Sequence, residues 1–372
     1  MKALKKLAAA AALLLALSPA RALAAAADES DDGVYTMVDL SGQTIMSMAG
    51  RIYVDDEYIS SNNQLYVVVE VDDASRQAVA QCLGDEPPYD AEKAQAVFAH
   101  ADAKRDEDGR SGRKLIAMYS THSDESYEKG DGTASLDRNA GIYDVDEALK
   151  EALEKLGIEV RLDTTTHLPH DAKAYSRSRR TAEELMKLAP DALLDIHRDG
   201  IPDESEYETE VNGEETSKVR LLVGRSNPNS AVNREFAKEI KAAADDKYEG
   251  LVKDIFIGKG DYNQDLMPHS LLLEFGTHTT DKDQAIDATR YMADVLNTVL
   301  YGDSARAEGA GASKGAASGI VWVIVIAALG GLIYALISTG TLKNLGARFS
   351  HGASELTGGL IGRENEDDPD DR

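Results

Sequence analysis

Three predicted strands end in residues that can hold a metal ion or move a proton. The segment LIAMYS leads to His122, ALLDI leads to His197, and SLLL leads to Glu274. In an open α/β sheet, ligands and catalytic groups gather just past the carboxyl ends of the strands. Two histidines and one or two glutamates delivered there from separate strands are what a catalytic zinc site needs. The pattern therefore predicts a zinc-dependent hydrolase.

The third ligand of the predicted zinc site is one of two carboxylates. Catalytic zinc takes three protein ligands and keeps one position for water, and His122 and His197 supply two of them. Glu125 follows His122 by three residues, on a turn that can fold its carboxylate back to the same ion. Asp137 lies where a following helix is expected to begin. The shorter loop favours Glu125, with Asp137 as the alternative.

Glu274 is the candidate general base of the site. Three leucines precede it, so we expect its carboxyl group to be desolvated at the edge of the sheet, which is the setting of many general bases. The alternative is that this carboxylate pairs with a buried arginine.

The neighbours of His197 are candidates for supporting roles. Arg198 and Asp199 follow it directly. They are expected to hold a substrate carboxylate and to orient an imidazole ring. Asp195, one pleat behind His197, is interpreted as structural.

The remaining histidines of this region are interpreted as rim residues. A proline lies between His167 and His170, and this loop context favours substrate binding over metal ligation. His269 and His278 bracket Glu274 and are placed at the rim as well.

The elements that must position these residues alternate between strand and helix. The predicted strands cover 115–120, 158–162, 192–196, 219–223 and 270–275, and the predicted helices cover 144–156, 176–188, 229–244 and 282–300. Such alternation is typical of a mostly parallel sheet covered by helices. The fold class is therefore α/β.

The segment before this domain carries strand signals of a different kind. Residues 34–71 contain short, β-branched and tyrosine-rich runs separated by turn residues such as Asn62 and Asn63. They predict a small β module without catalytic residue types, used for binding or as a spacer. The charged, alanine-rich stretch that follows is interpreted as a linker.

Two apolar segments bear on the compartment. Lys2, Lys5 and Lys6 precede a short apolar run and small residues, which is typical of a cleavable signal peptide, with an uncleaved anchor as the alternative. A second run, 319–338, is long enough to cross a bilayer. We therefore expect a single-pass membrane protein whose catalytic domain faces the cell wall. The expected parts are a signal peptide (1–26), a β module (33–80), a linker (81–113), a catalytic domain (114–303), a Gly/Ala/Ser tether (304–318), a transmembrane helix (319–340) and a cytoplasmic acidic tail (341–372).

Composition limits the possible partners and ligands. The formal net charge of -26 argues against nucleic-acid binding, which favours a basic face. Cys82 is the only cysteine, so an intramolecular disulfide and a cysteine-based zinc site are both excluded. A metal site must then be built from histidines and carboxylates.

At these residues the chain resembles the stage II sporulation protein P family. The likeness covers roughly 114–300. It rests on Thr121-His122 with Glu125-Ser126-Tyr127, on the HDAKAYSRSR stretch from His170, on Asp195-Ile196-His197-Arg198-Asp199, and on Tyr262-Asn263-Gln264-Asp265-Leu266 followed by Leu272-Leu273-Glu274.

The resemblance implies a zinc-dependent N-acetylmuramoyl-L-alanine amidase that also cleaves peptide cross-links. It implies that the protein thins septal peptidoglycan during engulfment, with the sporulation proteins D and M as partners. Carried onto this chain, His122 and His197 would be zinc ligands and Glu274 the catalytic carboxylate. Glu274 would take the proton of the attacking water, and Arg198 would stabilise the oxyanion.

Two other functions fit parts of the same pattern. A membrane-tethered wall-binding or scaffold protein with a degenerate site is the main alternative. A zinc peptidase acting on proteins ranks last, because the chain lacks the His-Glu-x-x-His helix of common metalloproteases.

Overall fold

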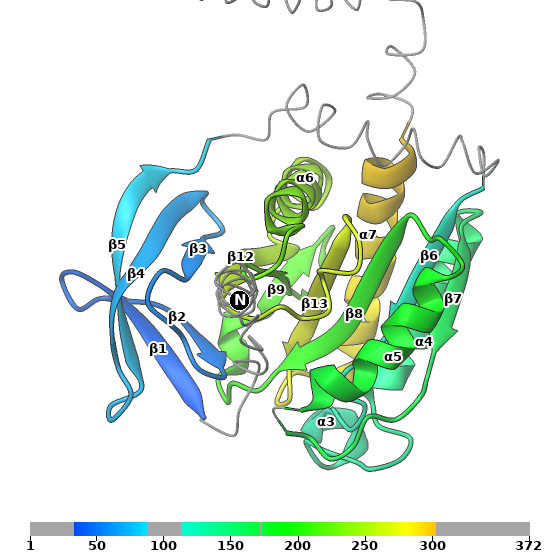
Figure 1. Ribbon diagram of the computed structural model, residues 1–372, viewed down its shortest axis with the longest axis horizontal. Coiled ribbons are helices and arrows are strands. Elements are labelled where there is room, and N and C mark those ends of the chain that lie inside the picture. The colour runs from blue at the N-terminus through cyan, green and yellow to red at the C-terminus, as the bar shows by residue number, and fades with distance from the viewer. Residues whose placement is uncertain (1–32, 88–112, 172, 303–372) are drawn as a thin grey trace, which may run out of the picture. The chain divides into compact units, whose positions relative to one another are not determined.

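The computed structural model describes residues 33–87, 113–171 and 173–302, which are built around one eleven-stranded mixed sheet (Figure 1). The strand order is β2-β1-β5-β4-β3-β12-β11-β13-β8-β6-β7, and β9 and β10 form a separate hairpin. The strands are β1 (Val34–Asp39), β2 (Thr44–Ala49), β3 (Glu57–Ile59), β4 (Gln64–Asp72), β5 (Gln77–Asp85), β6 (Leu115–Tyr119), β7 (Glu159–Asp163), β8 (Ala192–Asp199), β9 (Glu208–Val211), β10 (Glu214–Ser217), β11 (Val219–Gly224), β12 (Val252–Gly258) and β13 (Ser270–Thr277).

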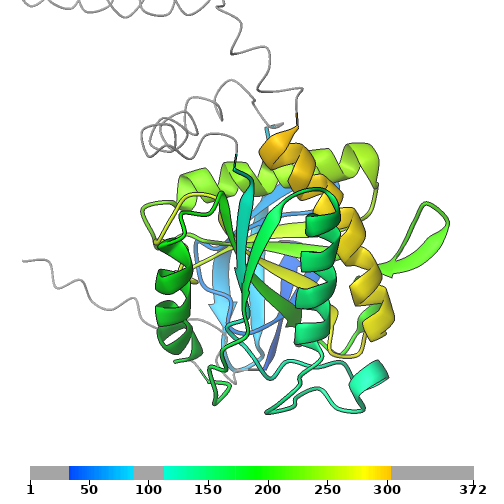
Figure 2. The same cartoon turned by 90° about the vertical axis from the view of Figure 1, so that its right-hand side faces the viewer.

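Helices cover both faces of this sheet. They are α3 (Glu128–Asp131), α4 (Ile142–Lys155), α5 (Ala174–Met186), α6 (Ser230–Lys247) and α7 (Lys282–Tyr301), with a 3₁₀ helix η1 (Glu204–Glu206). Side chains of α4, α6 and α7 share one hydrophobic core with one face of the central strands. Helix α5 packs on the other face, and Figure 2 shows it on the side of the sheet opposite α4 and α7.

The central sheet is mixed, whereas the sequence predicted a mostly parallel one. Strands β7, β6, β8 and β13 are parallel to one another, as expected. Strands β11 and β12 run the opposite way, because β11 pairs with β13 in the antiparallel sense. The described segment between β8 and β11 contains no crossover helix, so β11 begins at the edge of the sheet where β8 ends and runs back in the opposite direction. Four of the five neighbouring pairs from β12 to β7 are parallel, so the prediction of a mostly parallel sheet is correct for these strands, with β11–β13 as the exception.

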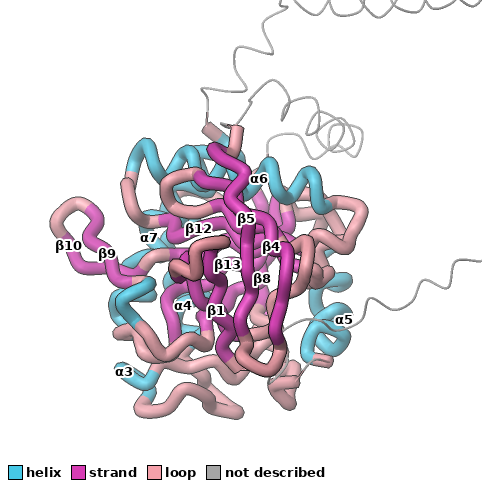
Figure 3. Tube along the Cα trace, turned by 90° about the vertical axis from the view of Figure 1, so that its left-hand side faces the viewer, coloured by secondary structure: helices cyan, strands magenta, loops and turns pink. Residues whose placement is uncertain are grey.

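Four strands were not predicted. Strand β5 lies largely in the segment interpreted as a linker, and β12 was missed between α6 and β13. The β9–β10 hairpin, which projects from the body of the protein in Figure 3, was missed as well. Its turn residues Asn212 and Gly213 both have positive φ. The Asn-Gly pair is a strong hairpin signal that could have revealed it.

The five N-terminal strands β1–β5 belong to the same sheet as the predicted catalytic domain. Strand β3 pairs with β12, matching Ile59 to Ile255 and Tyr58 to Phe256. Residues of these strands also share a hydrophobic core with Phe256 and Leu272 on the face that carries α5. The sequence suggested a separate β module, but these apolar faces are buried against the central strands.

Within the described ranges, no helix combines the length and the apolar character needed to span a bilayer. The predicted signal peptide (1–26), tether (304–318), transmembrane helix (319–340) and acidic tail (341–372) all lie outside those ranges.

Candidate metal centre and its neighbours

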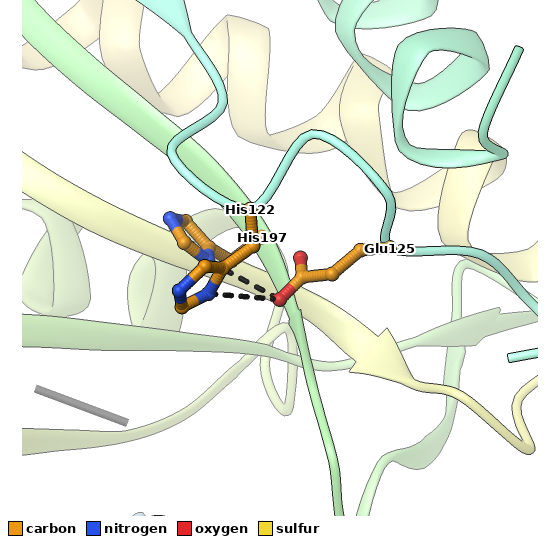
Figure 4. A group of neighbouring side chains, drawn as sticks. All are labelled: His122, Glu125 and His197. Carbon is orange, nitrogen blue, oxygen red and sulfur yellow. Dashed lines mark hydrogen bonds and ion pairs between the residues drawn. The ribbon is translucent and has the colours of Figure 1, made fainter. Parts of the chain in front are cut away.

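Three of the predicted residues meet in one buried cluster, His122, Glu125 and His197. Their candidate ligand atoms all lie within 4.8 Å of one another. Figure 4 shows the two imidazoles converging on one carboxylate oxygen. Oε1 of Glu125 lies 3.4 Å from Nδ1 of His122 and 3.4 Å from Nδ1 of His197. All three side chains are at most 1% exposed.

The local fold explains why these residues meet. Strands β6 and β8 are parallel neighbours, so their carboxyl ends open at the same edge of the sheet. His122 follows β6, and His197 lies in the last part of β8. The chain then turns, with the Glu125 N–H donating to the His122 carbonyl at 3.1 Å, which folds the Glu125 carboxylate back toward the strand ends.

The cluster fits a zinc ion. Two histidines and one glutamate are a ligand set of catalytic zinc. In tetrahedral coordination with bonds near 2.0–2.1 Å, neighbouring ligand atoms lie about 3.3 Å apart. The 3.4 Å separations from Glu125 Oε1 match this value and exceed the usual length of a hydrogen bond. Of the two carboxylates considered from the sequence as the third ligand, Glu125 lies in the cluster, whereas Asp137 is exposed and lies outside it.

Asp195 orients His197, a role that sequence reasoning gave to its neighbours. Oδ1 of Asp195 lies 2.9 Å from Nε2 of His197. The N–H and the hydroxyl of Thr121 donate to the same carboxylate at 2.8 and 2.6 Å, which fixes its position. A carboxylate on the outer nitrogen of a ligand histidine sets its tautomer. Asp195 and His197 are two residues apart on a strand and therefore share a face, a signal that was present in the sequence.

The charges of the buried groups favour binding of a cation between them. Burial alone would raise the pKa of Glu125, but His197 and Arg198 lower it well below its usual range. Burial would lower the pKa of His197, yet Asp195 and Glu125 raise it well above its usual value. The negative charge of these two carboxylates therefore attracts positive charge to the position between the side chains, and a metal ion would displace the proton of His197.

Glu274 lies in the neighbouring strand on the same face as His197. The two residues are register partners in the parallel pair β8–β13. The Glu274 side chain is 1% exposed, and its Oε2 accepts from the Tyr207 hydroxyl at 3.0 Å. Nη1 of the buried Arg220 lies 3.5 Å from the same oxygen. The alternative drawn from the sequence, in which Glu274 pairs with a buried arginine, is therefore confirmed. Glu274 also lies beside the cluster.

Arg198 lies beside the cluster with its guanidinium group turned to the backbone of a loop. It donates to the carbonyls of Ser126, Asp199 and Ala134 at 3.0–3.3 Å. The backbone N–H of Arg198 donates to Oε2 of Glu125 at 2.9 Å. These contacts indicate that Arg198 holds the loop after His122, and its sequence-based role toward an oxyanion stays a prediction. Asp199, the other candidate, accepts from Tyr207 and Arg220 instead.

Two aromatic residues beside the cluster were not assigned to it from the sequence. The ring of His170 stacks on His122 at 3.9 Å between centroids. Nδ1 of His170 lies 3.1 Å from Asp124. Tyr175 of α5 meets His122 edge-on at 5.4 Å and is stacked over His197 at 6.3 Å. These rings shield the imidazoles and limit their rotation.

A buried carboxyl group on α4 was also missed. Burial raises the pKa of Asp146 to about 8. Its Oδ2 accepts from the Ser120 hydroxyl at 2.9 Å. A neutral carboxyl group at this position adds no further negative charge beside Glu125 and Asp195.

The other predicted rim histidines have structural contacts. The ring of His167 is buried between the Ser120 carbonyl and the Thr181 hydroxyl, each at 2.9 Å. His269 packs on Phe236. His278 is partly exposed and lies outside the cluster.

Comparison with known proteins identifies a family match. The family model described as stage II sporulation protein P matches residues 38–297. The stage II sporulation protein P of Bacillus subtilis (strain 168) is 28% identical over 208 residues, which are 51% of this chain and 52% of that protein. The chain thus spans about half the length of this curated relative.

Solved structures of several amidases are also similar to this chain. The N-acetylmuramyl-L-alanine amidase Ami1 from Mycobacterium abscessus is 16% identical, with a TM-score of 0.33, over 51% of this chain and 97% of that one. The CwlD amidase from Clostridioides difficile, solved in complex with the GerS lipoprotein, is 16% identical, with a TM-score of 0.34, over 51% of this chain and 96% of that one.

Proposed function

This chain belongs to the stage II sporulation protein P family, and from that premise we propose that it is a zinc-dependent peptidoglycan hydrolase. The proposed reaction is hydrolysis of the amide between the lactyl group of N-acetylmuramic acid and L-alanine. Cleavage of peptide cross-links is proposed as a second activity of the same site.

One observation carries this proposal. The ligand atoms of His122, Glu125 and His197 converge within 4.8 Å in a buried position at the ends of two parallel strands. A carboxylate with a purely structural role would need only a hydrogen-bond donor. Here, two imidazole rings face the same carboxylate oxygen. Metal-assisted hydrolysis is the chemistry that such a group supports best.

The roles of the residues follow from their positions. A zinc ion held by His122, Glu125 and His197 would polarise the scissile carbonyl and acidify a bound water. Glu274 takes the proton of the attacking water and delivers it to the amide nitrogen as the C–N bond breaks. Asp195 keeps the tautomer of His197 fixed throughout.

The cellular setting is proposed from the sequence. The predicted signal peptide and the apolar segment 319–338 favour a single-pass protein with the site outside the cell membrane and a cytoplasmic C-terminal tail. There it would remodel septal peptidoglycan during engulfment, together with sporulation proteins of the D and M families.

The test uses the purified full chain and purified peptidoglycan, with mass spectrometry of the released muropeptides. The parent protein should release peptides with a free L-alanine amino terminus, and any cross-link cleavage would show as uncoupled stem peptides. The Glu274→Gln variant should be at least about 100-fold slower, because it lacks the proton acceptor. Chelation followed by metal-free dialysis should abolish release, and added zinc should restore it.

Exposed Glu147, on the outer side of α4, provides the matched control. The Glu147→Gln variant should digest peptidoglycan at the parent rate. Equal rates for Glu274→Gln and the parent would refute the role of Glu274. Full activity of the metal-free protein would refute the zinc dependence.

A further inference from the structure

Arg220 is a fully buried arginine in the row of strands that carries the site. Register pairs connect His197 to Glu274, Glu274 to Arg220, and Arg220 to Asp254 across strands β8, β13, β11 and β12. All four side chains are at most 2% exposed. A buried ion pair contributes little to stability compared with apolar packing, so its presence beside a candidate site suggests a functional reason.

The guanidinium group of Arg220 is held from three sides. Nε and Nη2 donate to the two oxygens of Asp254 at 2.7 and 3.1 Å, a bidentate contact that fixes the plane of the group. Nη1 donates to Asp199 at 2.9 Å and lies 3.5 Å from Oε2 of Glu274. Nη2 also donates to the carbonyl of Ser47 in β2 at 3.1 Å.

Tyr207 contacts the same carboxylates. Its hydroxyl group lies 3.0 Å from Oε2 of Glu274 and 2.9 Å from Oδ2 of Asp199. A phenol carries one proton, so it donates to one of these oxygens at a time. The ring packs beside the Arg220 guanidinium, 5.9 Å from the ring centroid. Arg220 and Tyr207 together therefore surround one oxygen of Glu274.

We infer that Arg220 and Tyr207 are positioning residues for Glu274, and that strand β2 is part of the same support. This inference rests on the proposed function, because it concerns the carboxylate that moves the proton. The Tyr207 hydroxyl donates to Oε2 and the Arg220 charge lies 3.5 Å from it, so the two groups restrict the orientation of the Glu274 carboxyl group, next to His197 in the register. Preorganisation of this kind determines how well a general base works.

The N-terminal strands contribute through their backbone. The Ser47 carbonyl accepts from Arg220, and the Ala49 N–H donates to Oδ1 of Asp199 at 3.0 Å. The Ser47 N–H also lies 3.4 Å from Glu206. Strand β2 therefore contacts the network through its backbone, which gives these strands a role beyond that of a spacer.

The first test is a double-mutant cycle in unfolding equilibria of the full chain, with the variants Tyr207→Phe and Glu274→Gln. Removing the hydroxyl group leaves the ring in place, so the variant should fold. If Tyr207 holds Glu274, the unfolding constant of the double variant should differ at least about fivefold from that expected for independent changes. Tyr291→Phe provides a matched control, since this hydroxyl contacts Val211 and Glu214 on the hairpin, and its cycle with Glu274→Gln should be additive.

The second test is the kinetics of peptidoglycan digestion. Tyr207→Phe should lower kcat about tenfold and leave KM within twofold, because substrate contacts are unchanged and only the base is misplaced. Arg220→Lys keeps the positive charge but cannot form the bidentate contact with Asp254. This variant should therefore also lower kcat at constant KM. Tyr291→Phe should match the parent in both constants.

The outcomes separate this inference from the proposed function. An additive Tyr207–Glu274 cycle overturns the inference whether or not the protein is an active hydrolase. Coupling with a kcat equal to that of the parent also overturns it. A coupled cycle in a protein that leaves peptidoglycan intact supports the positioning of Glu274 and counts against the hydrolase function alone.

Discussion

At the scale of single residues, the carboxylate of Asp195 holds the imidazole of His197 within the buried His122–Glu125–His197 cluster. His122 and His197 were predicted because they follow apolar strands whose carboxyl ends gather ligands and catalytic groups, and Glu125 because the loop that joins it to His122 is short. Asp195 was interpreted as structural: its spacing of two residues puts it on the same strand face as His197, but the sequence does not specify that its carboxylate contacts the His197 ring. Side-chain contacts of this kind depend on rotamers and on neighbouring strands, which a sequence pattern does not specify.

Asp195 offers a test at this scale. Asp195→Asn should weaken zinc binding by about 10–100-fold, because the outer nitrogen of His197 loses its charged partner. Competitive zinc titration with a chromophoric chelator measures this change directly. Asp56→Asn, also a change at a buried carboxylate but in the N-terminal strands, should leave the zinc affinity unchanged. The role given to Asp195 would be wrong if both variants bound zinc as tightly as the parent.

At the scale of elements, the end of β13 has a special backbone. The register with β8 shifts between Glu274 and Thr277, and Gly276 has a φ of +72°. A Cβ atom on Gly276 would lie 2.9 Å from the Ser217 hydroxyl and 2.9 Å from Thr280. This bulge lies between the proposed base and the last residue of β13, and at Gly276 only glycine fits the conformation without strain.

Gly276→Ala should therefore destabilise the protein by about 2–3 kcal/mol, from the left-handed conformation and the steric contact together. Gly213→Ala is the matched control, because Gly213 also has a positive φ (+83°) but no atom lies within 4 Å of its added Cβ. It should cost about 1–2 kcal/mol for the conformation alone. Urea unfolding of the two variants gives the difference in their free energies of unfolding. Equal losses would show that the neighbours of Gly276 accommodate the added Cβ without an energetic cost.

Helices were predicted more completely than strands. The amphipathic patterns indicated α4, α5, α6 and α7 to within about three residues at either end. Strand β12 was missed because seven buried residues that include a lysine and an aspartate do not alternate in polarity. Its Asp254 forms a bidentate contact with Arg220 of the next strand, a partner that the local sequence does not reveal.

At the scale of the whole molecule, Asp56 connects the N-terminal strands to the end of β11. Its Oδ1 accepts from Nε of Arg225 at 2.9 Å, and the Tyr53 N–H donates to Oδ2 at 2.7 Å. Burial raises the pKa of Asp56 to about 6, despite the opposing effect of Arg225. The sequence predicted these strands as a module of their own, because the pairing of β3 with β12 involves residues far apart in the chain.

This raised pKa predicts how stability changes with pH. Between pH 4 and 6 the folded protein binds the Asp56 proton more tightly than the unfolded chain, so this group's contribution to stability falls as pH rises. The rise of the Asp56 pKa from 3.8 to about 6 corresponds to about 3 kcal/mol. Asp56→Asn should match the parent near pH 4 and exceed its free energy of unfolding by up to about 3 kcal/mol at pH 7. Urea unfolding across this range is the measurement, and a difference independent of pH would contradict the assignment.

The pairing of β3 with β12 also determines when the protein can fold during its synthesis. Ile59 and Ile255 are register partners, although they are separated by roughly 200 residues, and such distant contacts form slowly. A nascent chain has made β1–β5 long before β12 leaves the ribosome. Until then, the apolar face of these strands cannot be buried against its partner. Since β2 also contacts Arg220 and Asp199, an incomplete chain would lack both its core and the support of Glu274. The candidate site would therefore be complete only after β12 and β13 have left the ribosome.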